Sequence, residues 1–221
     1  YKSANKYRVQ ACKNYNANIS FTVAEKAFDE VKDAEKQGYK FVHPFDGPHT
    51  LQGSATLGLE IIDQINDMDT KIDNVLISVG GGGLISGVGA VLKQIFPNIN
   101  IIGIEPDEAK GITDSLKSNQ PLQKVYINSI ADSLCAPIHM PYSFSIAKQV
   151  IDEMFNITDK DMSEAMLFAY NQLKLFLEPA CVAGFAALKK FQNKNFKGQN
   201  TLILLCGSNI DFQSWNSIVN H

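Results

Sequence analysis

The chain has 221 residues, of which 45% are hydrophobic and 19% are charged, and its formal net charge is −3. These values are typical of a globular protein with at least one substantial core, and they exclude a disordered chain. Basic residues are interspersed with acidic ones and form no stripe, so we expect no nucleic-acid partner. No segment approaches the ~18 consecutive apolar residues that span a bilayer, so we expect no membrane partner.

Four widely separated cysteines, Cys12, Cys135, Cys181 and Cys206, form no Cys-x-x-Cys pair. This spacing argues against a zinc site and against a disulfide scaffold, and it favours a reducing compartment. We therefore expect a cytoplasmic protein. The sequence begins at Tyr1 with neither an initiator methionine nor a targeting signal, which we interpret as a truncation at the N-terminal side.

The first predicted elements are a helix over residues 24–36 and a short apolar strand at Phe41–Val42. We interpret residues 1–45 as the remnant of a small domain and residues 46–221 as a larger domain. The larger domain opens with a helix that has apolar residues at helical spacing. These residues are Leu57, Ile61, Ile62 and Ile65.

A strand, a glycine loop, a helix and a second strand then follow in close succession. Residues 74–79 form an apolar run rich in β-branched side chains, and the run ends at Gly80–Gly83. Leu84 begins a helical pattern, and residues 99–105 form the next apolar run. This order is the signature of a parallel βαβ unit.

The alternation continues toward the C-terminus. Thr158 is a suitable N-cap for a helix that runs to Leu175, and residues 201–205 form another apolar strand. We therefore predict an α/β fold, with a parallel twisted sheet flanked by helices.

The glycine loop is the first candidate site. Gly80–Gly83 present backbone N–H groups that no Cβ shields, at the positive end of a helix dipole, which favours phosphate binding. The alternative is a tight turn with close strand–helix packing. No Gly-Lys-Ser/Thr follows the loop, which disfavours a nucleoside triphosphate. Glu105, at the end of the next strand, leaves a dinucleotide-binding protein open as an alternative.

A series of segments in chain order resembles the fold-type II pyridoxal-phosphate enzymes of the threonine/serine dehydratase (ammonia-lyase) family. The segments are HPFD at 43–46, TLGLE at 56–60, SVGGGGLISG at 78–87, GIEP at 103–106, IADSL at 130–134, LEPA at 177–180 and CGSNID at 206–211. The resemblance implies a tryptophan synthase beta-like fold, with residues 46–221 as the domain that binds pyridoxal phosphate. It also implies an amino-acid substrate and a homo-oligomer.

The resemblance further implies roles for individual residues. The cofactor phosphate would lie on Gly80, Gly81, Gly82 and Gly83 with the adjoining Leu84, the pyridine nitrogen would face Cys206, and Glu178 would lie near the ring. From the residues alone, the commoner role for Cys206 is that of a small buried apolar residue at a strand end. Glu178 is equally an acid at a helix N-terminus, where the dipole favours it.

A divalent-cation site is the next feature that the resemblance raises. Glu105 and the carbonyl of Ala109 match positions that bind a cation in some relatives. Gly111 stands where those relatives have a second carboxylate, so we expect cation binding to be weak or lacking.

Two departures from the family pattern bear on activity. No lysine lies in a Ser-Phe-Lys-x-Arg-Gly segment, which carries the Schiff-base lysine of the family, and no Ser-Ser-Gly-Asn-His loop is found. Residues 52–56 read QGSAT where relatives read AGQGT, which predicts a chemically altered loop beside the cofactor. We therefore expect β-elimination of a hydroxy amino acid to a 2-oxo acid and ammonia as the family activity, and an inactive chain by itself. A non-catalytic remnant that binds a ligand or partner is the other alternative.

Overall fold

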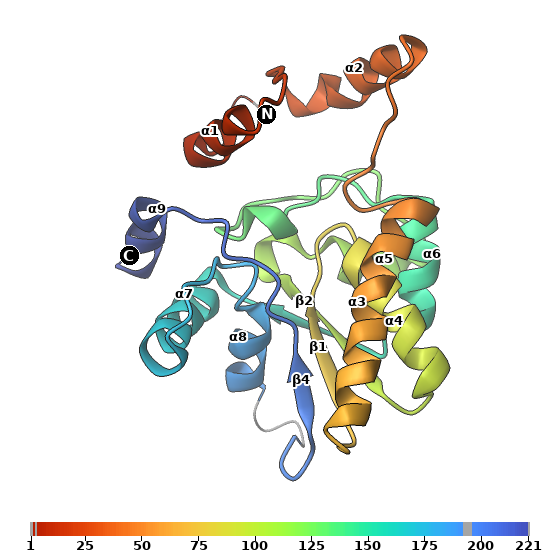
Figure 1. Cartoon of the computed structure of the whole chain (residues 1–221), viewed down its shortest axis with the longest axis vertical. Helices are drawn as coiled ribbons and strands as arrows, with labels where there is room; N and C mark the ends of the chain where they lie inside the picture. The colour runs from red at the N-terminus through yellow and green to blue at the C-terminus, as the bar shows by residue number, and fades with distance from the viewer. Residues whose placement is uncertain (1, 3, 192–195, 221) are drawn as a thin grey trace.

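The computed structural model describes residues 2, 4–191 and 196–220. Within these ranges the chain forms a four-stranded sheet with strand order β3-β2-β1-β4, in which every neighbouring pair is parallel. The strands are β1 (Asn74–Ser78), β2 (Asn100–Pro106), β3 (Glu153–Ile157) and β4 (Thr201–Ile203). Helices cover both faces of the sheet (Figure 1), so the predicted α/β fold is confirmed.

The helices form two layers. One face of the sheet is covered by α3 (Pro48–Asp67), α4 (Gly83–Ile95) and α6 (Pro141–Val150), and the other by α7 (Asp159–Phe168), α8 (Ala183–Lys190) and α9 (Phe212–Val219). Helix α5 (Gly111–Ser118) follows β2, and short 3-10 turns occur at Asp107–Ala109 and Asp132–Leu134. Helices α1 (Lys6–Asn14) and α2 (Ala24–Lys36) lie beyond the carboxyl ends of the strands, apart from the sheet (Figure 1).

The side chains of β1 alternate between two hydrophobic cores. Val75 and Ile77 pack in the core beneath α3 and α4, whereas Leu76 packs in the core beneath α7 and α8. All three side chains are fully buried. Because both faces of this strand are covered, its sequence is a continuous apolar run rather than an alternating one.

The central strands β1 and β2 were predictable for this reason, and β4 was predictable because its own sequence is an apolar run. Strands β1 and β2 confirm the predictions over 74–79 and 99–105, and β4 confirms the start of the 201–205 strand but ends at Ile203. Strand β3 has no counterpart among the predictions. It lies at the edge of the sheet and contains Glu153 and Asn156, so its sequence lacks an apolar run.

The helix that begins after Thr158 is confirmed at its start. The Thr158 hydroxyl accepts from the Asp161 backbone at 3.1 Å, and the Asp161 carboxylate accepts from the Thr158 backbone at 2.8 Å, which completes a capping box. The helix changes to a π-helical turn at Ala169 and ends before Lys174, whose φ is 61°. Its last helical residue is Leu173, so it stops two residues short of the predicted end at Leu175.

Of the two elements predicted near the N-terminus, the helix is confirmed and the strand is wrong. Helix α2 has the bounds predicted for it, 24–36. The predicted strand at Phe41–Val42 is wrong, because the segment pairs with no strand of the described chain and Val42 is 79% exposed. The division into domains 1–45 and 46–221 stays a prediction. In the described part of the chain, no helix combines the length and apolar character needed to cross a membrane.

Candidate functional site

The glycine loop connects the carboxyl end of β1 to the first turn of α4. Gly82 caps the helix with a φ of +90°, a left-handed conformation that favours glycine. The last ladder bond of the strand runs from the Val79 N–H to Ile104 O at 2.8 Å. Beyond it, the backbone N–H groups of Gly80–Gly83 have no acceptor among the described residues. They therefore form a set of free donors at the positive end of a helix, which is the geometry of an anion site.

Close packing also requires glycine in this loop. A Cβ on Gly81 would lie 2.1 Å from the Phe45 ring, and one on Gly83 would lie 2.7 Å from the Phe45 carbonyl oxygen. The turn around Phe45 is held by His43, whose Nδ1 accepts from the backbone of Phe45 at 3.2 Å and of Asp46 at 2.9 Å. His43 thus has a structural role. The loop combines the close packing of the tight-turn interpretation with the free donors that phosphate binding would require.

A pocket of about 410 Å³ opens in front of the loop. Four other segments form its walls: the 43–46 motif, the loop around Leu134, the segment that carries Glu178 and the segment that carries Cys206. The lining residues are Pro44, Phe45, Ser78 to Ile85, Ser133 to Pro137, Glu178, Ala180 and Cys206. Of the predicted cofactor residues, Gly80–Gly83, Leu84, Glu178 and Cys206 therefore come together around one pocket.

Glu178 lies almost fully buried at the pocket wall, with 8% of its surface exposed. Its Oε1 accepts from the Ser133 hydroxyl at 3.4 Å, and its Oε2 has no hydrogen-bond partner among the described residues. A Cβ on Gly207 would lie 2.5 Å from Oε1, so glycine after Cys206 lets the carboxylate approach that backbone. Glu178 lies in the connection before α8 rather than at the first turn of that helix, which disfavours the dipole alternative.

Cys206 follows β4 and its side chain faces the pocket. Burial, and then the negative charge of Glu178, raise the pKa of its thiol above the ordinary value. The thiol is therefore protonated and neutral at neutral pH. Cys206 is solvent-accessible, unlike the buried Cys181 nearby, so it is not the buried apolar residue of the alternative interpretation.

Glu105 and Ala109 do not line this pocket. Glu105 is fully buried at the end of β2, where Oε1 accepts from the Ile112 backbone at 2.7 Å and Oε2 accepts from the Thr113 backbone at 2.9 Å and hydroxyl at 2.7 Å. Burial raises the pKa of Glu105 to about 7 although these hydrogen bonds oppose the shift. The carboxylate thus anchors the start of α5, and both of its oxygens are used there rather than at the pocket.

The position of the second carboxylate in some relatives is filled differently in this chain. A Cβ on Gly111 would lie 2.1 Å from Nε2 of His139, so the imidazole occupies the space of a side chain at that position. His139 is 1% exposed, and burial lowers its pKa to about 4 although a hydrogen bond with the Gly81 backbone opposes the shift. Within the described residues, no group of three His, Cys, Asp or Glu side chains is arranged to hold a metal ion. Cation binding at Glu105 and Ala109 stays untested.

Several residues that support the loop were not predicted. Ser54 donates to the Gly83 carbonyl at 2.9 Å, and the Ser143 backbone donates to the Asp46 carboxylate at 2.7 Å. The expected loop at 52–56 is wrong, because these residues lie inside α3 and Ser54 faces α4. Single hydroxyls inside helical patterns carry no sequence signal, which is why these contacts were missed.

Comparison with known proteins gives consistent findings. The pattern of the family described as "Pyridoxal-phosphate dependent enzyme" matches residues 2–207. Phenylserine dehydratase of Ralstonia pickettii is 36% identical over 212 residues, which cover 95% of this chain and 64% of that protein. L-threonine ammonia-lyase of Thermotoga maritima is 31% identical over 213 residues, which cover 94% of this chain and 52% of that protein. The chain thus spans about half to two-thirds of the length of these relatives.

Solved structures resemble the chain over nearly its whole length. The processed form of threonine deaminase isoform 2 from Solanum lycopersicum has a TM-score of 0.87 at 29% identity, covering 99% of this chain and 64% of that one. Maize serine racemase has a TM-score of 0.85 at 27% identity, covering 100% of this chain and 68% of that one.

Proposed function

This chain belongs to the family of pyridoxal-phosphate-dependent enzymes and has their fold-type II architecture, and from that premise we propose that its glycine loop binds the phosphate of pyridoxal phosphate. The observation that carries the proposal is the set of free backbone donors from Gly80 to Gly83. They open into a pocket that also contains a neutral thiol and a buried carboxylate. Helix dipole and donors together favour a dianionic phosphate at this point.

The remaining pocket residues fit the ring of the cofactor. Cys206 would face the pyridine nitrogen, and its raised thiol pKa keeps this partner neutral at neutral pH. A neutral partner would leave the ring nitrogen unprotonated. Glu178 would lie beside the ring, and Leu84 beside the phosphate. When bound, pyridoxal phosphate supplies the electron sink that elimination at Cβ of an amino acid requires.

We further propose a reaction class of the threonine/serine dehydratase type. Relatives named phenylserine dehydratase and L-threonine ammonia-lyase support a β-hydroxy amino acid as the substrate class, with a 2-oxo acid and ammonia as products. The chain's own residues would hold the cofactor and exclude water from the pocket. Within residues 1–221 no lysine has the family's Ser-Phe-Lys-x-Arg-Gly context, so this chain alone would bind the cofactor without turnover.

A titration of the purified 221-residue chain with pyridoxal phosphate tests this proposal. We expect saturable binding by absorbance and calorimetry, competition by inorganic phosphate, and no lysine that borohydride links covalently to the cofactor. Serine, threonine and phenylserine should release no ammonia. Lack of saturable binding would overturn the phosphate site, and a borohydride-linked lysine or ammonia release would overturn the proposed inactivity.

A variant pair separates the glycine loop from adventitious binding. Gly82→Val places a β-branched side chain at a φ of +90°, which moves the donors. We expect binding to weaken by more than about tenfold, because at least one charge-assisted hydrogen bond is lost. Gly53→Ala is the matched control, since a Cβ there meets nothing within 4 Å, and it should bind like the unmodified chain.

A further inference from the structure

Arg8, on the otherwise exposed helix α1, reaches the rim of the pocket. Its Nη1 and Nη2 donate to the two carboxylate oxygens of Asp132 at 2.8 and 3.2 Å, and its Nε donates to the Asn209 carbonyl at 3.0 Å. All three guanidinium nitrogens are therefore engaged by segments more than a hundred residues away in sequence. A bidentate pair of this kind fixes the orientation of the guanidinium group.

The same guanidinium group is the cation beside Glu178. Its Nη2 lies 3.8 Å from Glu178 Oε2, the buried oxygen that has no hydrogen-bond partner in the described chain. The other titratable groups that face Glu178 are the thiols of Cys181 and Cys206, and the charge of Glu178 contributes to the raised pKa of both. Neither thiol supplies positive charge, so Arg8 is the compensating group for a buried anion that otherwise costs free energy.

Asp132 connects this ion cluster to the glycine loop. Ser133 and Leu134 follow Asp132, and a Cβ on Gly80 would lie 3.0 Å from the Ser133 carbonyl oxygen and 3.1 Å from the Leu134 Cα. The turn that Arg8 holds therefore packs directly on the first glycine of the loop.

Helix α1 depends on polar contacts for its place at this rim. None of its residues is buried. Apart from Arg8, Asn5 holds it through bonds from Nδ2 to Asp211 at 3.3 Å and to Ser214 at 3.4 Å. Figure 1 shows α1 beyond the carboxyl end of the sheet, next to the connection into α9. Arg8 thus links three segments at the mouth of the pocket.

We propose that Arg8 is a positioning residue of the cofactor pocket, which compensates the charge of Glu178 beside Cys206 and holds the 132–134 turn against the glycine loop. The proposal rests on the proposed function for its significance, because it assigns Arg8 to the same pocket. Without Arg8, an uncompensated carboxylate would face an anionic cofactor, and the turn on Gly80 would lose its anchor.

The first test uses the chain without any ligand and reads the electrostatics at Cys206. Alkylation of Cys206 by iodoacetamide is followed by peptide mass spectrometry across a range of pH, since the thiolate is the reactive form. In Arg8→Met, the charge of Glu178 is uncompensated and raises the Cys206 pKa further, so alkylation near pH 8 should slow by about threefold. Arg8→Lys keeps the charge and should restore most of the rate. In a Glu178→Gln background, adding Arg8→Met should leave the alkylation rate of Cys206 unchanged.

The second test measures pyridoxal phosphate binding by the same variants. We expect Arg8→Met to bind about tenfold more weakly at neutral pH, Arg8→Lys to recover most of the affinity, and Arg8→Met with Glu178→Gln to lie near Glu178→Gln alone. Circular dichroism confirms that each variant is folded, which is expected because α1 buries no residue. If Arg8→Met does not fold, Asp132→Asn, which removes the bidentate anchor, should change the alkylation profile in the same direction.

The outcomes separate the two proposals. A chain that fails to bind pyridoxal phosphate but shows the Arg8 effect on Cys206 would overturn the proposed function and leave the positioning role standing. Equal Cys206 profiles in Arg8→Met and the unmodified chain would overturn the role of Arg8, whatever the cofactor does. Arg8→Lys behaving like Arg8→Met would overturn charge compensation.

Discussion

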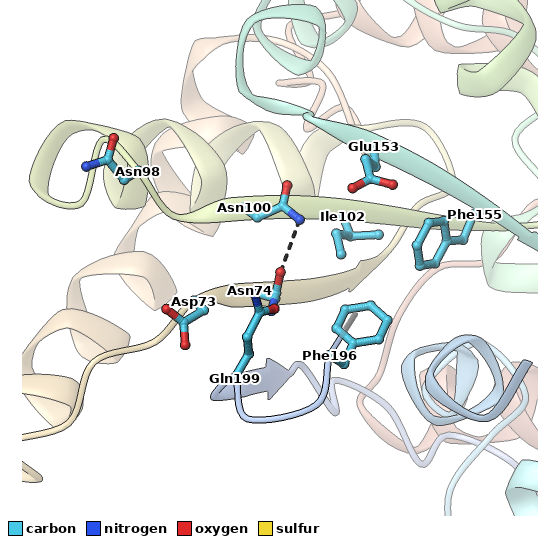
Figure 2. A pocket seen from close by; sticks show the side chains of 9 residues that line it. All are labelled: Asp73, Asn74, Asn98, Asn100, Ile102, Glu153, Phe155, Phe196 and Gln199. Carbon is cyan, nitrogen blue, oxygen red and sulfur yellow. Dashed lines mark hydrogen bonds between the residues drawn. The ribbon is translucent and has the colours of Figure 1, made fainter. Parts of the chain in front are cut away.

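The parallel strands have a hollow at their amino ends, the amino edge of the sheet, and another at their carboxyl ends, the carboxyl edge. The two hollows differ in whether their polar groups are hydrogen-bonded. Figure 2 shows the hollow at the amino edge, about 500 Å³ in volume and therefore larger than the glycine-loop pocket. Its amides bond one another: Asn100 donates to Asn74 at 3.1 Å, and Asn74 donates to Gln199 at 2.8 Å. Backbone donors at this edge are also used, since the Asp73 and Asn74 N–H groups share the Asn200 carbonyl.

At the carboxyl edge the corresponding groups are left free. The N–H groups of Gly80–Gly83 lack acceptors in the described chain, and Glu178 has an unbonded oxygen. Parallel strands end here and helices begin, so backbone donors and dipoles converge on one point. The candidate site is therefore distinguished by polar groups that are left unused rather than by the volume of the hollow.

The largest effects are expected from two buried titratable groups behind the glycine loop, Glu105 and His139. Burial raises the pKa of Glu105 from 4.5 to about 7 and lowers that of His139 from 6.5 to about 4. Between pH 4.5 and 6.5, the folded chain keeps a proton on Glu105 that the unfolded chain releases, which makes stability fall as the pH rises. In the same range the unfolded chain binds a proton on His139 that the folded chain lacks, which makes stability rise as the pH rises. The opposite contributions of Glu105 and His139 to the pH dependence of stability therefore largely cancel.

Substituting either residue should reveal the pH dependence of stability that the other residue contributes. In His139→Gln, the free energy of unfolding should fall by up to about 3 kcal/mol as the pH rises through the folded pKa of Glu105. In Glu105→Gln, it should fall by a similar amount as the pH drops through the folded pKa of His139. Urea unfolding at a series of pH values measures both, and flat profiles in the two variants would contradict the shifts. The amino edge has no buried pair of this kind among the described residues.

A second comparison pairs one buried polar side chain from each edge. Asn74 is 4% exposed, and its side-chain amide hydrogen-bonds to Asn100 at the start of β2 and to Gln199 just before β4. Asn74→Ala should therefore cost about 1–2 kcal/mol in the free energy of unfolding. Because the amino edge lies away from the glycine loop, pyridoxal phosphate affinity should stay the same. Calorimetric binding and urea unfolding on one preparation check both expectations. A loss of affinity would contradict the prediction and show that the amino edge affects cofactor binding.

Ser54→Ala is the matching change at the carboxyl edge. It removes the bond from Ser54 to the Gly83 carbonyl, which costs about 1 kcal/mol of stability. Here pyridoxal phosphate binding should weaken as well, by about threefold, because the loop loses a restraint. Unchanged affinity would mean that packing against Phe45 alone fixes the loop.

The site could be predicted from the sequence only where its residues are contiguous. The glycine loop was predictable because strand, glycines and helix are contiguous, and because β1 is apolar throughout. Glu178 and Cys206 could be added only through the family resemblance, since nothing local marks them. Arg8, Ser54 and His139 were missed because their partners are distant in sequence and their residue types are common on helices and loops. The cytoplasmic location and the homo-oligomer stay predictions.

The edge strand β3 and the N-terminal segment show the limit for the fold. Strand β3 is held by pairing with β2, from Ile102 opposite Glu153 to Pro106 opposite Ile157, and its own sequence has no apolar run. Phe41–Val42 has the reverse character, since it is apolar but pairs with no strand of the described chain. Strand formation depends on the partner as well as on the residues.

The smallest effect is expected at Asp73, on the amino edge. A bond from Lys71, and then one from the Asn200 backbone, hold the pKa of Asp73 below its ordinary value. The stability it contributes is therefore present above pH 3.8 and is lost as the pH falls through the lower folded pKa. Asp73→Asn should leave pyridoxal phosphate affinity unchanged and reduce the melting temperature slightly, and added salt should shrink the difference because the ion pair is exposed. A salt-independent loss comparable to that of Asn74→Ala would show that the backbone bond to Asn200, rather than the charge, is what this edge requires.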